Sequence, residues 1–251
     1  MAQLHSVPTL QKPTLSAQVA RHLLDLIQQQ NLRPGDLVPS EVQICKDLQV
    51  SRGSVREAYR TLAALGILEI ESGRRPRLQS VSEHALAQVF GYALKTAQVD
   101  HSHVIETRRA IEVQGAQLAA RNVTDAQKRT LRELVRQMRS ALGEHDHARR
   151  MTADMAIHTT LAEASCNPLN PLLLAALRAP LEQVMSIDLG NRRSESELIR
   201  IVDAHDAIVE RVCAGDAVGA GAAMAMHFDL SVGSMSTDGS ASGGPEVANL
   251  T

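Results

Sequence analysis

The spacing of apolar residues predicts a chain that is helical almost throughout. In the first third, apolar residues recur every three or four positions, which is the spacing of one helix face. This pattern predicts helices over residues 14–30, 40–49 and 51–65, followed by a short β-hairpin with arms at 67–71 and 77–79. The expected order is therefore helix, helix, turn, helix and hairpin.

Helix-capping residues support these boundaries. Residues 33–36, Arg-Pro-Gly-Asp, interrupt the first helical pattern. Ser40 with Gln43 three residues later forms a capping-box signature, in which each side chain satisfies a backbone N–H of the first turn. Ser51 is placed to cap the third helix and Gly66 to end it.

From about Ser82 onward the pattern is helical and no sustained strand alternation occurs. Candidate helices cover residues 84–98, 102–122, 124–142, 147–165, 169–189, 195–214 and 216–232. The predicted fold is mainly α: an N-terminal winged helix-turn-helix domain over 14–80, then an all-α antiparallel helical bundle over 84–232. Residues 1–13 are expected to form a flexible arm, and the Gly- and Ser-rich residues 233–251 a disordered tail.

Charge divides along the same line. The 251 residues carry a net charge of −2, but residues 1–80 hold 10 Lys and Arg against 7 Asp and Glu, and the remainder is acidic. Only four aromatic residues are present, which disfavours single-strand nucleic-acid binding by base stacking. No apolar run approaches a membrane span, and three cysteines without a C-x-x-C pair indicate a reduced, cytoplasmic protein.

The front domain carries the pattern of a DNA-binding helix-turn-helix. With its apolar face buried, the third helix must project Arg52, Arg56 and Arg60 outward, while its N-terminus offers hydroxyls and N–H groups to phosphates. A solvated basic face is the alternative, but a second basic site on the hairpin tip favours DNA. The candidate DNA-binding residues are Ser51, Arg52, Gly53, Ser54, Arg56, Gly73, Arg74 and Arg75.

Four motifs in this domain resemble the GntR family of bacterial winged-helix regulators. They are Leu-Val-Pro-Ser-Glu at 37–41, Val-Ser-Arg-Gly-Ser-Val-Arg-Glu-Ala-Tyr-Arg at 50–60, Leu-Gly-Ile-Leu at 65–68 and Ser-Gly-Arg-Arg-Pro-Arg at 72–77. The resemblance implies operator contacts from residues 51–54 and Arg56, with Gly73 and Arg74 on the wing. Where the family usually has a basic residue after Pro-Ser-Glu, this chain has Val42, so that contact is lost or supplied by Gln43 or Lys46.

In the back domain, ionisable residues lie on helix faces that should be buried. Five such residues each interrupt an apolar stripe: Arg108, Asp154, His158, His205 and His227. Burying an ionisable side chain destabilises the fold unless the side chain has a hydrogen-bond or charge partner. Asp154 and His158 are one helical turn apart and can point at a common centre. One carboxylate with three imidazoles suits Zn²⁺, with Ni²⁺ or another first-row divalent ion as alternatives. Arg108 could then bind a carboxylate ligand in bidentate fashion.

Each of these residues also has a simpler interpretation. An Asp and a His four residues apart arise by chance on many helices, and a core histidine usually hydrogen-bonds a neighbour. A buried arginine is commonly in a salt bridge, here to Glu112 or Glu163. It is the convergence of four helix stripes that favours the metal site.

The back domain resembles the FCD ligand-binding domain of the FadR subfamily. The resemblance rests on Arg108-x-x-x-Glu112, Asp154-x-x-x-His158, Asn167-Pro168, His205 and His227. It implies that the Asp and three His bind a metal beside a small organic or sugar acid effector, with Arg108 and Asn167 lining the cavity. Asn167 could instead cap the helix that Pro168 opens.

Three functions are compatible with these features. The first is a homodimeric transcription factor, expected to be a repressor, that reads a palindromic operator and responds to an acid bound at a metal. The second is a metalloenzyme, since an ion with an open position can activate water, but no acid–base residue is recognisable beside the ligands. The third is a DNA-binding protein with a structural metal. We expect the first, and no enzymatic activity.

Overall fold

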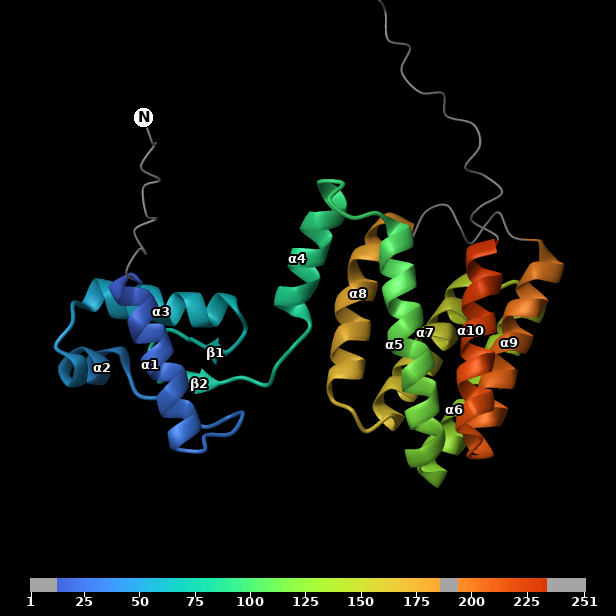
Figure 1. The fold of residues 1–251 in the computed structure, drawn as a ribbon, viewed down its shortest axis with the longest axis horizontal. Coiled ribbons are helices and arrows are strands. Elements are labelled where there is room, and N and C mark those ends of the chain that lie inside the picture. The colour runs from blue at the N-terminus through green and yellow to red at the C-terminus, as the bar shows by residue number, and fades with distance from the viewer. Residues whose placement is uncertain (1–12, 186–193, 234–251) are drawn as a thin grey trace, which may run out of the picture. The chain divides into compact units, whose positions relative to one another are not determined.

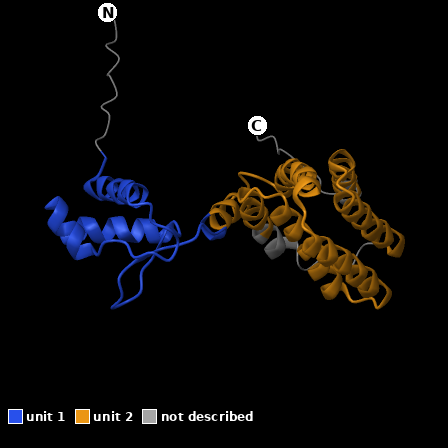
Figure 2. Cartoon of the chain, turned by 90° about the horizontal axis from the view of Figure 1, so that it is seen from below, with its two compact units in different colours: residues 1–85 blue, residues 86–251 orange. Residues whose placement is uncertain are grey.

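The computed structural model describes residues 13–185 and 194–233, and for 179–185 and 231–233 the backbone alone. The chain divides into two compact units, residues 1–85 and 86–251 (Figure 2). Apart from their innermost residues, the predicted arm and tail lie outside the described part of the chain.

The first unit has the predicted order of three helices and a hairpin (Figure 1). Its elements are α1 (Leu15–Gln29), α2 (Glu41–Leu48), α3 (Arg52–Ala64), β1 (Leu68–Glu69) and β2 (Arg77–Leu78). Ser40 Oγ accepts the Gln43 N–H at 3.2 Å, but the predicted capping box is only half formed, because the Gln43 side chain donates to Asp47 Oδ1 at 2.7 Å. The predicted cap at Ser51 is present, and its Oγ accepts the Ser54 N–H at 3.2 Å. Gly66, at a φ of +71°, ends α3, because that left-handed conformation favours glycine.

The wing is shorter than predicted and has an additional partner. In the antiparallel β1–β2 pair, Leu68 lies opposite Leu78 and Glu69 opposite Arg77. Leu37, which the sequence pattern did not assign to a strand, forms an antiparallel bridge with Arg77. A single bridging residue has no alternation to detect, so this contact could not be predicted from periodicity.

The core of this unit lies between α1, α2, α3 and β1. Its buried side chains are Val19, Leu23, Val38, Ile44, Val55, Ala58, Tyr59, Leu62 and Leu68. Tyr59 donates a hydrogen bond to the Pro39 carbonyl at 2.6 Å, which ties α3 to the segment before α2. Leu65, the last residue of the predicted third helix, lies just past the end of α3 and is 56% exposed.

The second part of the chain is helical, as predicted. Its helices are α4 (His84–Lys95), α5 (His101–Asn122), α6 (Asp125–Gly143), α7 (His147–Ala164), α8 (Leu169–Met185), α9 (Glu195–Cys213) and α10 (Ala217–Gly233). Thr124 with Gln127, and Ser194 with Glu197, each form a capping box at the start of α6 and α9. None of the helices in the described part of the chain is long and apolar enough to cross a membrane.

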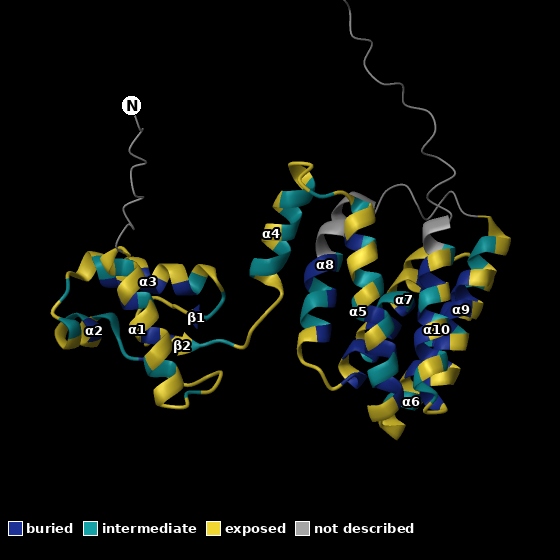
Figure 3. Ribbon diagram, viewed as in Figure 1, coloured by how far each residue is buried: buried dark blue, intermediate teal, exposed yellow. Residues whose placement is uncertain are grey.

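The long helix α5 occupies the centre of this unit. It packs against α7, α8, α9 and α10, while α6 packs against α7 and α9. Buried residues follow the inward faces of these helices (Figure 3). The main core is built largely from Ala, Val, Leu and Ile with Met138, Met224 and Phe228. Because the ionisable residues singled out in the sequence lie on these same inward faces, the packing brings them together.

Candidate DNA-binding surface and metal centre

The N-terminus of α3 presents polar groups on the surface. Ser51, Arg52 and Gly53 are exposed, and the Ser51 and Ser54 hydroxyls lie 3.0 Å apart. The first turn of a helix has N–H groups with no intrahelical acceptor, and its partial positive charge attracts anions. This end of α3 can therefore accept a phosphate while Arg52 reaches farther out.

Arg56 is the next basic side chain along the exposed face of α3. Its Nε lies 3.7 Å from Glu41 Oε2, and its side chain is 62% exposed. An exposed pair of this kind contributes about 0–1 kcal/mol, so DNA can displace Glu41 at little cost. In the first turn of α2, Val42 is an apolar side chain that is 52% exposed. Lys46, one turn later, is exposed.

The wing tip holds its two arginines differently. Gly73 adopts a φ of +76°, and Arg74 pairs with Glu71 while its side chain stays 76% exposed. Arg75 Nη2 instead donates to the Val38 carbonyl at 3.3 Å, which holds the side chain against its own domain. Of the two, Arg74 is the better placed to meet DNA.

In the bundle, three histidines form a buried cluster. His158 of α7, His205 of α9 and His227 of α10 are 2%, 0% and 6% exposed. One nitrogen from each ring lies within 4.8 Å of the others, and the ring centroids are 4.3 to 5.3 Å apart. Three imidazoles this close together can all direct nitrogen lone pairs at one cation.

Asp154 lies at the same cluster. Its Oδ1 is 3.0 Å from His205 Nε2, and its Oδ2 accepts a hydrogen bond from Arg178 Nη2 at 3.1 Å. The structure therefore brings together Asp154, His158, His205 and His227, the four metal ligands expected from the sequence. Arg178 of α8 is an additional charged partner that the sequence reasoning did not include.

Hydrogen bonds to the far ring nitrogens set the orientation of two imidazoles. His158 Nδ1 donates to Glu112 Oε2, and His205 Nδ1 donates to the Ile201 carbonyl at 2.8 Å. Both Nε2 atoms consequently face the centre of the cluster, 3.3 Å apart. Fixing the tautomer and ring orientation in this way is how a carboxylate or carbonyl prepares a histidine to bind a metal.

Burial and neighbouring charges shift the pKa values of two of the proposed ligands. Burial opposes ionisation of Asp154, but the hydrogen bond from His205 and the charges of His205, His158 and Arg178 hold its pKa well below the usual range. Burial and the charges of His205 and His158 keep the pKa of His227 well below its usual value. An ionised carboxylate beside a neutral imidazole is the state in which both groups ligate a metal.

Arg108 is part of this assembly through Glu112. Its Nε and Nη2 lie 2.9 and 2.8 Å from Glu112 Oε1, and its guanidinium carbon lies 5.7 Å from the Phe228 ring centroid. Burial alone would raise the pKa of Glu112, but the charges and hydrogen bonds of His158 and Arg108 lower it to about 2. The salt bridge considered from the sequence as an alternative for Arg108 is therefore present.

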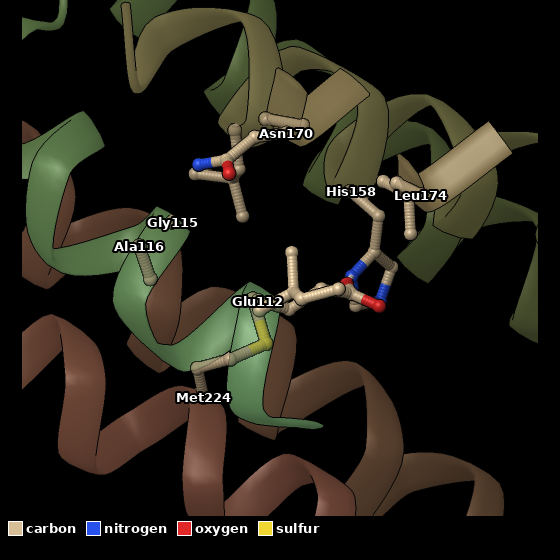
Figure 4. A pocket seen from close by; sticks show the side chains of 10 residues that line it. Glu112, Gly115, Ala116, His158, Asn170, Leu174 and Met224 are labelled. Carbon is tan, nitrogen blue, oxygen red and sulfur yellow. Dashed lines mark hydrogen bonds and ion pairs between the residues drawn. The ribbon is translucent and has the colours of Figure 1, made fainter. Parts of the chain in front are cut away.

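Two asparagines near the start of α8 have distinct positions. Asn167 is exposed, and its Oδ1 accepts the Leu169 N–H at 3.1 Å, so it caps the helix. Asn170 is 8% exposed and lines a cavity between α5, α7, α8 and α10, and its Nδ2 donates to Ser165 Oγ at 3.0 Å. In Figure 4 Asn170 lies across this opening from Glu112 and His158.

Two family models match the chain. The model for bacterial regulatory proteins of the gntR family matches residues 15–77, and the FCD domain model matches residues 103–230. The chain belongs to the GntR family. Within this family the winged helix binds DNA and the FCD domain binds a small-molecule effector, so the protein is a ligand-responsive transcriptional regulator and not an enzyme.

Individual relatives agree with this assignment. The HTH-type transcriptional regulator LutR of Bacillus subtilis is 30% identical over 207 residues, covering 81% of this chain and 93% of that protein. A putative L-lactate dehydrogenase operon regulatory protein of Escherichia coli is 31% identical over 229 residues, covering 86% and 84%. The solved structure of a Streptococcus agalactiae GntR protein is 27% identical, with a TM-score of 0.59 and coverage of 86% and 98%.

Sequence reasoning about this GntR protein missed three residues of the site. Glu112 was considered only as a partner for Arg108, and its role as acceptor for His158 depends on a contact between α5 and α7. Arg178 interrupts an apolar stretch, Pro-Leu-Leu-Leu-Ala-Ala-Leu, at 171–177, which is a detectable signal. Asn170 lies four residues before Leu174, on the buried face of α8, and that spacing could have identified it as inward-facing.

Proposed function

We propose that this GntR-family regulator is a homodimeric repressor that binds a palindromic operator and is controlled by a small organic or sugar acid. The acid would bind next to a divalent metal in the FCD domain. The observation that carries this proposal is the cluster of His158, His205 and His227 with Asp154, which couples three helices of the bundle through one buried site.

Operator binding would use the exposed groups of α3 and the wing tip. The proposed contacts are Ser51, Arg52, Gly53, Ser54, Arg56, Gly73 and Arg74, with Arg75 joining only if it leaves the Val38 carbonyl. Arg52 is the best candidate for reading guanine, because an extended arginine can bond both guanine acceptors. Two copies would present two α3 helices to the half-sites of a palindrome, and the bound dimer would exclude polymerase from the promoter.

The metal would be held by Asp154, His158, His205 and His227. Nitrogen and oxygen donors of this kind favour Zn²⁺, with Ni²⁺ and other first-row divalent ions as alternatives. An ion bound there would supply a positive charge, and an ion that takes five or six ligands could also accept a carboxylate oxygen. The protein holds the imidazoles in place through Glu112 and the Ile201 carbonyl.

For Arg108 and Asn167, the contacts favour supporting roles. Arg108 places two nitrogens on Glu112 Oε1, so we assign it to anchoring Glu112. Asn167 caps α8, so we assign it no contact with the effector. The asparagine that lines the cavity is Asn170. Both assignments leave the metal as the main point of attachment for the effector carboxylate.

Regulation requires that the effector binds one arrangement of the dimer more tightly than another. Coupling of this kind is typically about 1–3 kcal/mol, which changes operator affinity about 5- to 150-fold. The protein would act in the cytoplasm, where its operator is. The E. coli relative is named for an L-lactate dehydrogenase operon, which makes 2-hydroxy acids the first effectors to test.

A thermal-shift screen of organic and sugar acids tests this proposal, on zinc-loaded and chelator-treated protein. An acid at about 100 times its dissociation constant should stabilise the folded state by about 2.7 kcal/mol. We expect a shift that requires zinc, and the same acid should release a labelled operator in a gel-shift assay. If chelation lowers the Tm of the protein but no acid raises it, the metal is structural and the proposal fails.

A further inference from the structure

Helix α10 has one side that points away from its neighbours in the bundle. The helix lies between α5 and α9 and packs against both (Figure 1). A Cβ at Gly221 would lie 2.5 Å from Gln117 Nε2 of α5, and a Cβ at Gly219 would lie 2.9 Å from Arg211 Cδ of α9. These contacts occupy two sides of α10, so a third side faces outward.

The outward side of α10 is apolar. Val218 is 81% exposed and Met226 is 63% exposed, and Ala222 between them is exposed as well. These three residues are spaced four apart, so they form one row along the helix, which we call the α10 row. Among Asp, Glu, Lys and Arg, α10 contains Asp229 alone. A helix that is apolar on its outward side as well as its inward side is normally buried, which indicates that a partner covers the row.

The α10 row is symmetric about Ala222. Val218 lies four residues before Ala222, and Met226 lies four residues after it. If a second α10 crosses antiparallel at Ala222, Val218 of each copy meets Met226 of the other copy. A two-fold axis requires this reciprocal pairing, so the row is complementary to itself.

The charges at the two ends of the row also suit a second copy. Arg109 Nη2 lies 3.1 Å from Asp229 Oδ1 at one end, and Arg211 Nη1 lies 3.0 Å from Asp216 Oδ2 at the other. An antiparallel crossing brings the first pair of one copy beside the second pair of the other. Because each pair has one positive and one negative group, the two ends attract each other and no like charges accumulate.

The surface around the row is large enough for a dimer. The 17 residues of α10 span about 25 Å at 1.5 Å per residue. With α5 and α9 packed at about 8–10 Å on either side, this surface is about 25–30 Å wide. Two copies would bury about 1,200–1,500 Å² in total, and specific interfaces bury about 1,200–2,000 Å².

We propose that two copies of this chain dimerise through the α10 row, with the two helices crossing antiparallel at Ala222. The inference rests on the proposed homodimer and names the surface that forms it. His227, a proposed metal ligand, lies on the buried side of the same helix. A displacement of α10 at the histidine cluster would therefore reach the dimer contact directly.

Sedimentation equilibrium of the full-length protein tests this contact. Met226→Glu buries a charge in the apolar interface and should weaken dimerisation about 100-fold or more. Met151→Glu, at an exposed methionine of α7, is the matched control and should dimerise as the wild type does. Adding Val218→Lys to Met226→Glu should restore the dimer, because the new lysine of each copy would meet the new glutamate of the other.

The outcomes separate this inference from the proposed homodimer. If the wild type is a dimer and Met226→Glu dimerises as strongly as Met151→Glu, the α10 contact is wrong and the homodimer stands. If the wild type is a monomer, both proposals fail. If Met226→Glu weakens the dimer but Val218→Lys does not restore it, the antiparallel crossing is wrong.

A disulfide at the crossing point is an independent test. In a Cys166→Ser background, Ala222→Cys should form a covalent dimer on mild oxidation, because a residue on the two-fold axis meets its own copy. The two Cα atoms must lie within about 4.4–6.8 Å for this bond. Thr130→Cys, at an exposed position of α6, is the control and should stay monomeric under reducing-free electrophoresis. Equal cross-linking of the two variants would overturn the proposed crossing.

Discussion

His158 and Glu112 face each other across the contact between α7 and α5, with the imidazole Nδ1 donating to the carboxylate. This single bond turns His158 Nε2 toward His205 and connects the histidine cluster to Arg108 on the same helix as Glu112. Glu112 is therefore the residue that links helix α5 to the histidine cluster.

Glu112→Gln should weaken zinc binding about 10- to 100-fold, because the neutral amide holds His158 less firmly and reduces its basicity as a ligand. Competition with a fluorescent zinc chelator measures the change. Glu163→Gln, on an exposed position of α7, is the matched control and should bind zinc as the wild type does. An unchanged affinity in Glu112→Gln would mean that His158 is oriented by packing alone.

His205→Ala should abolish stoichiometric metal binding, since it removes the ligand that contacts both Asp154 and His158. Metal content after dialysis, measured by mass spectrometry, tests this. His22→Ala, an exposed histidine on α1, serves as the control. Wild-type metal content in His205→Ala would refute the proposed ligand set.

Arg52→Ala should weaken binding to the operator more than binding to random DNA, because we expect Arg52 to contact a base edge. The difference between the two binding free energies should fall by about 1–3 kcal/mol. The operator can be selected from a random duplex library with the wild-type protein, and both affinities measured by fluorescence anisotropy. Arg129→Ala, an exposed arginine on α6, should change neither. Equal losses on both DNAs would indicate a phosphate contact only.

Stabilisation by zinc should increase with pH. Burial disfavours the charged form of His205 and would lower its pKa. The hydrogen bond and the negative charge of Asp154 outweigh this effect, so the pKa of His205 is raised. In the metal-free protein, the stability from this pair is present below the unfolded pKa and is lost as pH rises through the folded pKa. Zinc competes with the same proton on Nε2. The zinc-induced rise in Tm should therefore be larger at about pH 8 than at about pH 6, and a smaller rise at the higher pH would contradict this account.

Gly221→Ala should destabilise the bundle by about 1–3 kcal/mol, because overpacking forces neighbours to move. A Cβ at Gly221 of α10 would lie 2.5 Å from Gln117 Nε2 and 2.8 Å from Gln117 Cγ of α5. Urea denaturation measures the loss, and Gly143→Ala, where a Cβ meets nothing within 4 Å, is the control. Adding Gln117→Ala to Gly221→Ala should restore part of the lost free energy of unfolding, because it removes the side chain that the new Cβ meets. If nothing is restored, the overpacking does not involve Gln117.

The helices, most of their caps and the inward position of the four proposed metal ligands were determined by the sequence. Apolar periodicity and capping boxes are local properties, so Ser51, Thr124 and Ser194 could be identified as helix starts without a structure. The same periodicity placed His205 and His227 on buried faces, where an ionisable group needs a partner.

Only the tertiary structure decided which partners those residues have. The Glu112–His158 bond and the Arg178–Asp154 pair join residues that are 46 and 24 positions apart. The position of Asn170 at a cavity likewise depends on how four helices pack. The wing's bridge from Leu37 to Arg77 is equally non-local. Sequence periodicity specifies which face of a helix is buried, but the neighbours of that face depend on how the helices pack. By contrast, Arg108 and Glu112 are one turn apart on the same helix, so their salt bridge could be listed from the sequence as one of two alternatives, and the structure shows that it forms.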